Sequence, residues 1–145
     1  MPSKLEIEET PGYPAAADQI KQCPIDFTSQ VIGKKFTSVI LRNMIYLNQK
    51  RFNEFLAIKG INPKTQSLRL KEMQRNGIID RKVYDETPIR IEYSLTEKGR
   101  ALRPVLEQMM AFSMRYYSKE IFKDGRPRTV PEFFGSDPQK LIIRE

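Results

Sequence analysis

The sequence predicts a mostly helical α+β fold, with a small helical core, one β-hairpin and a long helix after it. Apolar residues recur at helical spacing from residue 24 to residue 76, and then alternate with polar residues from 78 to 95. The turn residues Asp-Glu-Thr-Pro divide the alternating stretch, which is typical of a hairpin. The chain has 145 residues, a length that suits a single domain.

The first three helices are predicted to be short. Residues 24–32 begin with a proline and are followed by a glycine, which are ordinary start and stop signals. Residues 35–47 are apolar around most of the helix, so we expect this segment to be buried. A third helix is expected within residues 50–58, with Asn53 as its N-cap.

The fourth helix has the clearest boundary signals, and we expect it to span residues 63–76. Asn62 is a good N-cap, and Gly77 stands where a glycine commonly ends a helix. The helical wheel places Gln66, Leu70 and Met73 on the core side. The opposite side carries Lys64, Leu68, Lys71 and Arg75, flanked by Thr65 and Glu72. Short polar and cationic residues near a helix N-terminus suit insertion into the major groove of DNA.

The two strands of the hairpin are predicted at residues 78–84 and 89–95. Arg90 lies just after the turn, on the face opposite Ile89 and Ile91. We expect Arg90 to enter a narrow minor groove, where the potential is most negative, and Arg81 to contact phosphate. Alternatively, Arg90 pairs on the protein surface with Glu86 or Glu92.

A long helix is expected next, from a cap at Thr96 to about residues 118–122. It carries two adjacent apolar stripes. A single small domain cannot bury both of them. An exposed apolar surface of this kind usually marks an interface, so we expect two copies to pair along it as a symmetric dimer. The interface residues expected on this helix are Leu102, Val105, Leu106, Met109, Met110, Phe112 and Tyr116. Alternatively, the C-terminal tail folds back over one stripe.

Three helices followed by a β-hairpin form the winged helix-turn-helix arrangement, here extended by N- and C-terminal dimerisation helices. We assign residues 23–118 to this domain. Residues 1–22 are interpreted as an N-terminal arm that orders only against a partner, and residues 119–145 as a tail that is irregular until the Leu-Ile-Ile run near its end.

Composition excludes most enzyme classes. One cysteine and no histidine leave almost no material for a zinc site or a histidine-assisted nucleophile, and there is no glycine-rich phosphate loop. No apolar run approaches the roughly 20 residues of a membrane helix, and the first residues lack the apolar region of a secretory signal. We therefore expect a cytoplasmic protein that has no cofactor, is not an enzyme and does not associate with a membrane.

The charge is positive and unevenly distributed. The whole chain carries +7, and residues 1–22 hold two cationic and four acidic side chains, which leaves +9 on residues 23–145. A basic body favours a polyanionic partner, because binding to phosphates releases counterions. The alternative is that the lysine side chains only keep the protein soluble and that the positive charge has no specific partner.

Cys23 stands immediately before the first helix. The positive end of a helix dipole favours the thiolate, whereas Asp26 in the first turn opposes it. A lone cysteine is more often a small buried apolar residue than a sensor. A disulfide from Cys23 would have to join a second chain or a small thiol.

Five stretches within residues 23–118 combine a Cys-Pro start, an Arg-Phe-Asn-Glu motif and an Arg-Ile-Glu-Tyr-Ser-Leu-Thr strand. They are CPIDFTSQVIGKKFTSVILRN (23–43), KRFNEFLAI (50–58), INPKTQSLRLKEMQRNGIIDRKVY (61–84), ETPIRIEYSLTEKG (86–99) and LRPVLEQM (102–109). In order and spacing they resemble the HxlR-type, MarR-like family of winged helix-turn-helix transcription regulators.

The resemblance implies a dimeric regulator that binds double-stranded DNA, with the recognition helix at 63–76 and the wing at 78–95. It implies that the first helix joins the last in the dimer contact, which adds Phe27 and Val31 to the expected interface. Some members use the cysteine at the position of Cys23 to sense oxidants or electrophiles, so an oxidant or small-molecule effector is also implied.

Three residues depart from the family pattern. Phe36 stands where a tryptophan is usual, and Gln66 stands where a leucine is usual on the core side of the recognition helix. Leu68 faces outward where a polar residue is usual, which favours contact with a thymine methyl group over a hydrogen bond.

The leading hypothesis is a homodimeric regulator on a pseudo-palindromic operator. Lys64, Thr65, Ser67 and Leu68 would read bases, Lys71, Arg75 and Arg81 would hold phosphates, and Arg90 would enter the minor groove. The alternative is a winged-helix protein–protein adaptor without specific DNA binding.

Overall fold

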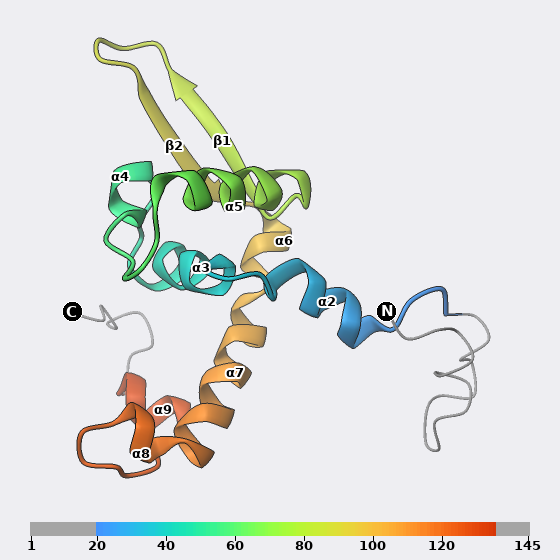
Figure 1. The fold of residues 1–145 in the computed structure, drawn as a ribbon, viewed down its shortest axis with the longest axis vertical. Helices are drawn as coiled ribbons and strands as arrows, with labels where there is room; N and C mark the ends of the chain where they lie inside the picture. The colour runs from blue at the N-terminus through green and yellow to red at the C-terminus, as the bar shows by residue number, and fades with distance from the viewer. Residues whose placement is uncertain (1–19, 136–145) are drawn as a thin grey trace. The chain divides into compact units, whose positions relative to one another are not determined.

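The structure is a computed structural model that describes residues 20–135, and the chain divides into two compact units, one ending at Lys35 and one beginning at Phe36. The first unit contains α2 (Pro24–Ile32), and the second contains the other described elements (Figure 1). In order these are α3 (Thr37–Tyr46), α4 (Phe52–Phe55), α5 (Pro63–Arg75), β1 (Ile79–Tyr84), β2 (Arg90–Leu95), α6 (Glu97–Arg100), α7 (Arg103–Tyr116), α8 (Ser118–Ile121) and α9 (Val130–Phe134). Each helix within residues 20–135 is too short or too polar to cross a lipid bilayer.

The core of the second unit gathers apolar side chains from its helices and from the root of the hairpin. The buried residues that form the helix-turn-helix part of this core are Ile40, Leu41, Met44, Phe55, Ile58, Leu70, Met73, Ile78, Ile79 and Tyr93. They confirm the burial predicted for the second helix and for the core side of the fourth. The mostly helical α+β fold with a hairpin is likewise confirmed.

The ends of α5 follow the sequence signals. The Asn62 side chain accepts a hydrogen bond from the Thr65 N–H at 2.8 Å, which satisfies one of the free donors of the first turn. At the other end Gly77 has φ of 70°, a left-handed conformation that glycine adopts without steric cost. The Ile78 N–H then reaches back to the Met73 carbonyl, so the helix closes as predicted.

The predicted cap of α4 was wrong. Asn53 lies inside the helix, and the N-cap position belongs to Arg51. The carboxylate of Glu54 accepts the backbone N–H groups of Lys50 and Arg51 at 3.2 and 3.0 Å, and this bonding sets the start of the helix two residues earlier. A carboxylate in the first turn can satisfy these donors as well as an asparagine cap can.

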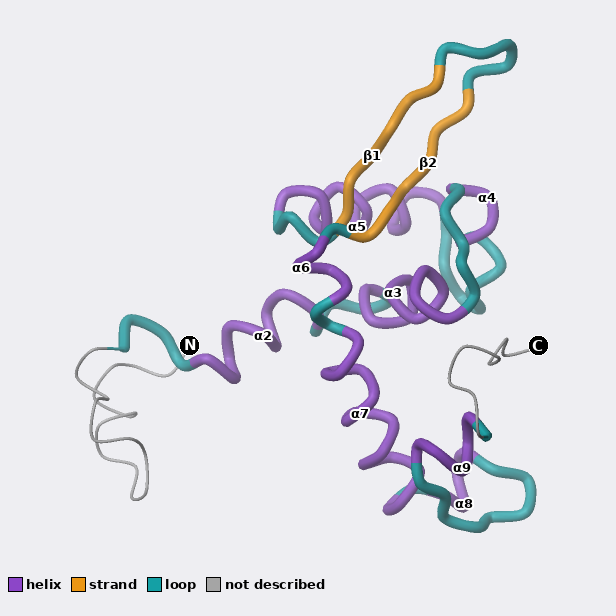
Figure 2. The backbone as a smooth tube through the Cα atoms, turned by 180° about the vertical axis from the view of Figure 1, so that it is seen from behind, coloured by secondary structure: helices purple, strands orange, loops and turns teal. Residues whose placement is uncertain are grey.

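The hairpin is a two-stranded antiparallel ribbon that extends beyond α5 (Figures 1 and 2). Its register pairs Ile79 with Leu95 at the root and Tyr84 with Arg90 near the turn. The Tyr93 N–H donates to the Lys50 carbonyl at 2.7 Å, so the segment before α4 lies against β2. The wing is therefore attached by its backbone to the start of the helix-turn-helix.

The single long helix expected after the wing is divided into three. Thr96 caps α6 as predicted, by accepting the Gly99 N–H at 3.0 Å. Ala101 and Leu102 keep right-handed helical backbone angles, but the Leu102 N–H bonds to Gly99 three residues back, so the regular α-helical hydrogen bonding is interrupted there; it restarts in α7, with Pro104 in the first turn. Proline has no N–H to donate and its ring conflicts with the carbonyl four residues earlier, so a continuous helix cannot pass this point undistorted.

Gly99 allows α6 to pack against the root of the wing. A Cβ atom at this position would lie 2.1 Å from the Ile78 carbonyl oxygen, far inside any real contact. The same carbonyl accepts the Thr96 N–H at 3.0 Å. Only a residue without a side chain lets the two backbones approach this closely.

The C-terminal segment is more regular than expected. Residues 118–134 contain α8 and α9, and Figure 2 shows both beside the C-terminal end of α7. Phe134 is 5% exposed and stacks on Tyr46 of α3. The described part of the tail therefore folds back on α7, as one alternative held. The expected Leu-Ile-Ile element and nearly all of the N-terminal arm lie outside the described residues.

Candidate nucleic-acid interface

The outward face of α5 carries the predicted cationic row. Lys64, Leu68, Lys71 and Arg75 follow one another at spacings of three or four residues, and all four are exposed. Thr65 and Ser67 are half-buried on the flank of this row. The row presents positive charge over the length of the helix, with Leu68 as a 47% exposed apolar residue within it.

The inward face of α5 is fixed by packing and by one unusual polar contact. Gln66 is fully buried, and its Nε2 donates to the Phe52 carbonyl of α4 at 2.6 Å. Its Oε1 is buried without a hydrogen-bond partner. The bond joins the two helices of the helix-turn-helix directly, so the departure at Gln66 noted in the sequence has a structural role.

Arg69 is the cation of α5 that does not join the outward row. It forms an ion pair with Glu72 at 3.3 Å, and both side chains are largely buried. The i, i+3 spacing of this pair is visible in the sequence, but it does not reveal the burial. The free positive charge of α5 is therefore carried by Lys64, Lys71 and Arg75.

The wing separates its charged residues onto two faces. Residues opposite each other in an antiparallel pair share a face, so Arg81 lies with Tyr93. Lys82 and Tyr84 lie on the other face with Arg90 and Glu92, and the Lys82 ammonium is 4.8 Å from the Tyr84 ring centre. Arg81 and Lys82 are both exposed, on opposite sides of the ribbon.

Arg90 adopts the alternative arrangement, in which it pairs on the protein surface. Its guanidinium lies 3.1 Å from Glu86 and 3.3 Å from Glu92, and its central carbon is 4.0 Å from the Tyr84 ring centre. Two carboxylates and an aromatic ring thus hold the side chain that was expected to project into a groove. The sequence showed these glutamates but not their geometry.

Glu92 also forms ion pairs with two basic side chains of the segment before α4. Lys50 and Arg51 approach its carboxylate at 3.8 and 4.0 Å, and each of these side chains is about half exposed. They form a second basic cluster beside the wing that the sequence prediction missed. The signal was present in the Lys-Arg pair directly before α4.

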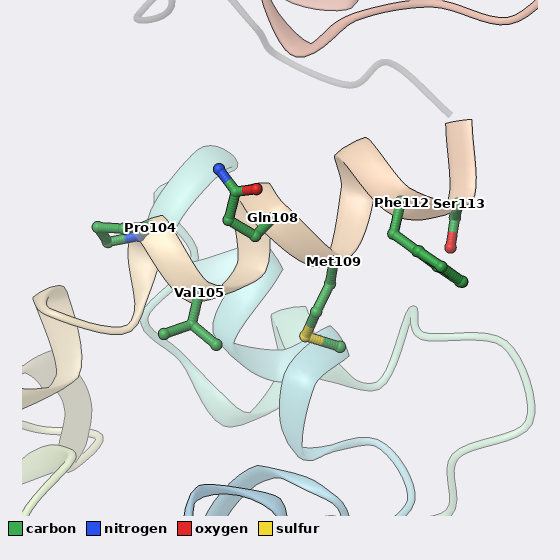
Figure 3. A pocket seen from close by; sticks show the side chains of 6 residues that line it. All are labelled: Pro104, Val105, Gln108, Met109, Phe112 and Ser113. Atoms are coloured by element: carbon green, nitrogen blue, oxygen red, sulfur yellow. The ribbon is translucent and has the colours of Figure 1, made fainter. Parts of the chain in front are cut away.

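The predicted interface on α7 is partly exposed. A groove along this helix is lined by Pro104, Val105, Gln108, Met109, Phe112 and Ser113. In Figure 3 the side chains of Val105, Met109 and Phe112 point to the same side of α7. Phe112 is 57% exposed and lies 5.4 Å from the ring of Tyr116, which is also exposed.

Three of the interface residues predicted on this helix are partly or fully buried within the chain. Leu106 is 6% exposed, so it belongs to the core and is not available to a partner. Leu102 is half-buried where the helix begins again. Met110 is half-buried and lines an apolar pocket with Met114 and Phe133. Phe133 of the tail lies beside Met110, which reduces the apolar surface that Met110 offers a partner, and the burial of Leu106 argues against its expected place in the dimer interface.

The first unit presents its own apolar residues. In α2, Phe27 is 52% exposed and Val31 is half-buried. Cys23 occupies the N-cap position of α2 and is in no disulfide. Within residues 20–135, no cluster of three acidic or cysteine side chains could hold a metal ion.

Comparison with known proteins gives one consistent result. A family described as "HxlR-like helix-turn-helix" matches residues 31–121. The "uncharacterized HTH-type transcriptional regulator YdeP" of Bacillus subtilis is 38% identical over 106 residues, which cover 72% of this chain and 82% of YdeP.

Solved structures agree. The oxidized form of the redox regulator HypR is 42% identical, with a TM-score of 0.58 over 63% of this chain and 94% of HypR. The reduced form of the regulator YodB from B. subtilis is 34% identical, with a TM-score of 0.57 over 66% of this chain and 94% of YodB. The family match ends at residue 121, before α9 begins.

Proposed function

Because this chain belongs to the HxlR-like helix-turn-helix family of DNA-binding transcriptional regulators, we propose that it acts as a homodimer on a pseudo-palindromic operator. Membership of this family favours DNA binding over a protein–protein adaptor or an enzyme. The observation that supports the proposal best is the exposed row of cations on α5, held over a rigid inward face.

In this proposal α5 enters the major groove of each half-site. Lys64, Thr65, Ser67 and Leu68 lie toward the N-terminal half of the helix and would face base edges. Farther along, the side chains that would hold phosphates are Lys71, Arg75 and, on the wing, Arg81.

The wing has a modified role in the proposal. Because Glu86 and Glu92 already bind Arg90, we assign this arginine to bracing the wing and not to entry into the minor groove. Lys50 and Arg51 lie next to the wing root and supply the positive charge that approaches the DNA backbone there.

The dimer would form through the exposed part of α7 and the exposed residues of α2. On α7 the exposed residues are Met109, Phe112 and Tyr116, beside the half-buried Leu102, Val105 and Met110; on α2 they are the exposed Phe27 and the half-buried Val31. Large exposed apolar side chains such as Phe112 on α7 and Phe27 on α2 are typical of an interface. Pairing about a two-fold axis would place the two α5 helices about 34 Å apart, one turn of the duplex.

The test is a titration of labelled DNA fragments with the protein at several salt concentrations, combined with sedimentation of the free protein. We expect a dimer that prefers particular fragments and loses affinity steeply as salt rises. Equal binding to all fragments, or a monomer at the concentrations that bind DNA, would contradict the proposal. Footprinting on the DNA upstream of its own gene would then locate the operator.

An oxidant-responsive regulator is a second, compatible proposal. HypR is described as a redox regulator, and here Cys23 lies at the N-terminal end of α2, where the helix dipole stabilises a thiolate. Two Cys23 thiols from two chains would lose two protons and two electrons to an oxidant and join as a disulfide. A non-reducing gel of oxidised protein beside Cys23→Ser tests this, and identical mobility and DNA binding of the two would leave Cys23 a structural role.

A further inference from the structure

The α9 segment reaches back from the end of the chain to the winged helix. Phe134 is 5% exposed, and its ring stacks on Tyr46 of α3 with 5.3 Å between centroids and 24° between planes. Phe133 meets Phe134 edge-on at 5.3 Å and also lines the pocket beside Met110 and Met114 of α7. One short helix therefore contacts both α3 and α7.

Tyr46 is also the residue that joins α3 to α7 directly. Its hydroxyl donates to Glu107 at 3.3 Å, and Glu107 accepts from Arg103 at 3.0 Å. The Arg103 guanidinium lies 5.4 Å from the Tyr46 ring centre. Burial, followed by the negative charge of Glu107, raises the pKa of Tyr46 to about 12, so the hydroxyl remains a donor. Phe134 thus stacks on a residue that already links the two helices.

The loop before α9 is built to hold it in place. Asp124 accepts the Arg126 N–H at 3.0 Å and pairs with Arg128, and the Arg128 guanidinium lies 4.0 Å over the Phe122 ring. Thr129 and Glu132 then form a reciprocal capping box at the start of α9. This set of contacts gives the segment a defined path from α8 to α3.

The helix that needs such support is α7. The regular α-helical hydrogen bonding is interrupted between α6 and α7 at Ala101 and Leu102, so an unbroken set of helix hydrogen bonds does not fix the direction of α7 relative to the wing and α5. In the dimer proposed above, the direction of α7 decides how far apart the two recognition helices lie. One base pair of spacing moves a half-site by about 3.4 Å and rotates it by about 35°, so a small error in this direction matters.

We propose that α9 clamps α7 against α3 through Phe134, and so fixes the half-site spacing that the dimer accepts. This inference rests on the proposed function. It concerns a segment outside the residues that the family match covers.

The experiment measures the affinity of the full-length chain for operators whose half-sites are separated by the native distance or by one or two base pairs more or fewer. The variants are Phe134→Ala, and Phe134→Leu, which keeps apolar burial without the stacked ring. The matched control is Arg126→Lys, which keeps the charge and lies in the same exposed loop. Circular dichroism and sedimentation establish that each protein is folded and dimeric.

We expect the wild type and the control to share one sharp spacing preference. In the Phe134 variants, affinity for the native spacing should fall about fivefold or more and the preference should flatten, with the dimer intact. An unchanged spacing profile in either folded variant overturns the clamp, as does conversion of Phe134→Ala to a monomer. If Phe134→Ala fails to fold, the profile of Phe134→Leu decides. A wild type that is monomeric or indifferent to sequence would instead contradict the proposed function.

Discussion

The buried amide of Gln66 offers a prediction in which DNA binding weakens without a matching loss of stability. In Gln66→Leu the fully buried side chain is replaced by the residue usual at this position in the family that the sequence resembles. The bond to the Phe52 carbonyl disappears, which costs about 1 kcal/mol net, or about 1–3 kcal/mol if that carbonyl is left unpaired.

Two gains oppose this loss. The Oε1 atom is buried without a partner, and removing it recovers about 1–3 kcal/mol of desolvation. The leucine adds apolar burial of about 1–2 kcal/mol at the same site. We therefore expect the free energy of unfolding to lie between about 1 kcal/mol below and about 4 kcal/mol above that of the wild type.

Operator affinity should nevertheless fall, because α5 loses the polar bond that sets its position against α4. Positioning errors of about half an ångström already weaken a preorganised site. Urea unfolding gives the stability, and titrations with operator and unrelated DNA give the specificity ratio, for which Gln66→Met is the matched control of similar length. A variant that is destabilised by more than about 2 kcal/mol, or that binds operator as tightly as the wild type, would refute this reasoning.

Four further predictions test other contacts. Lys64→Ala should weaken operator binding by about 1–3 kcal/mol in an anisotropy titration if the lysine contacts a base, and an unchanged curve removes it from the interface. Glu92→Gln leaves Arg90 with one carboxylate fewer, so binding to unrelated DNA should tighten and its dependence on log salt should steepen by about one unit; an identical slope argues against it. Phe112→Asp places a charge on the exposed α7 face and should shift the sedimenting species toward monomer, whereas a persistent dimer would move the interface elsewhere. The pKa of Tyr46 is about 12 when folded and 10.0 in the unfolded reference, so its contribution to stability is complete below pH 10 and is lost as pH rises toward 12; Tyr46→Phe should lose less stability over that range in urea unfolding.

Local signals explain why much of the fold could be predicted. Asn62 and Gly77 mark the ends of α5 because capping and left-handed geometry depend on only a few neighbouring residues. The alternation of apolar and polar residues that predicts the wing also depends only on residues close together in the sequence. The interruption before α7 could also have been predicted, because Pro104 disfavours a continuous helix at this point. The apolar stripes that run through it favoured a single helix instead.

Contacts between distant residues explain what the sequence could not provide. The stacking of Phe134 on Tyr46 joins positions 88 residues apart, and no local pattern indicates it. The burial of Leu106 depends on how the segments around α7 pack, so its apolar spacing alone suggested a dimer residue. For Arg90 the sequence contained both the residues for a groove contact and the glutamates for a surface pairing, and the side-chain geometry shows the pairing with Glu86 and Glu92.

The backbone bond between Tyr93 and Lys50 ties the wing to the segment that begins the helix-turn-helix. A rotation of the β-ribbon at its base would therefore strain a backbone hydrogen bond to the segment that begins α4. The Gln66–Phe52 bond joins α4 to α5 in turn, so two hydrogen bonds link the wing to α5 by way of the α4 segment. Slow hydrogen exchange at the Tyr93 amide would report that this joint stays closed.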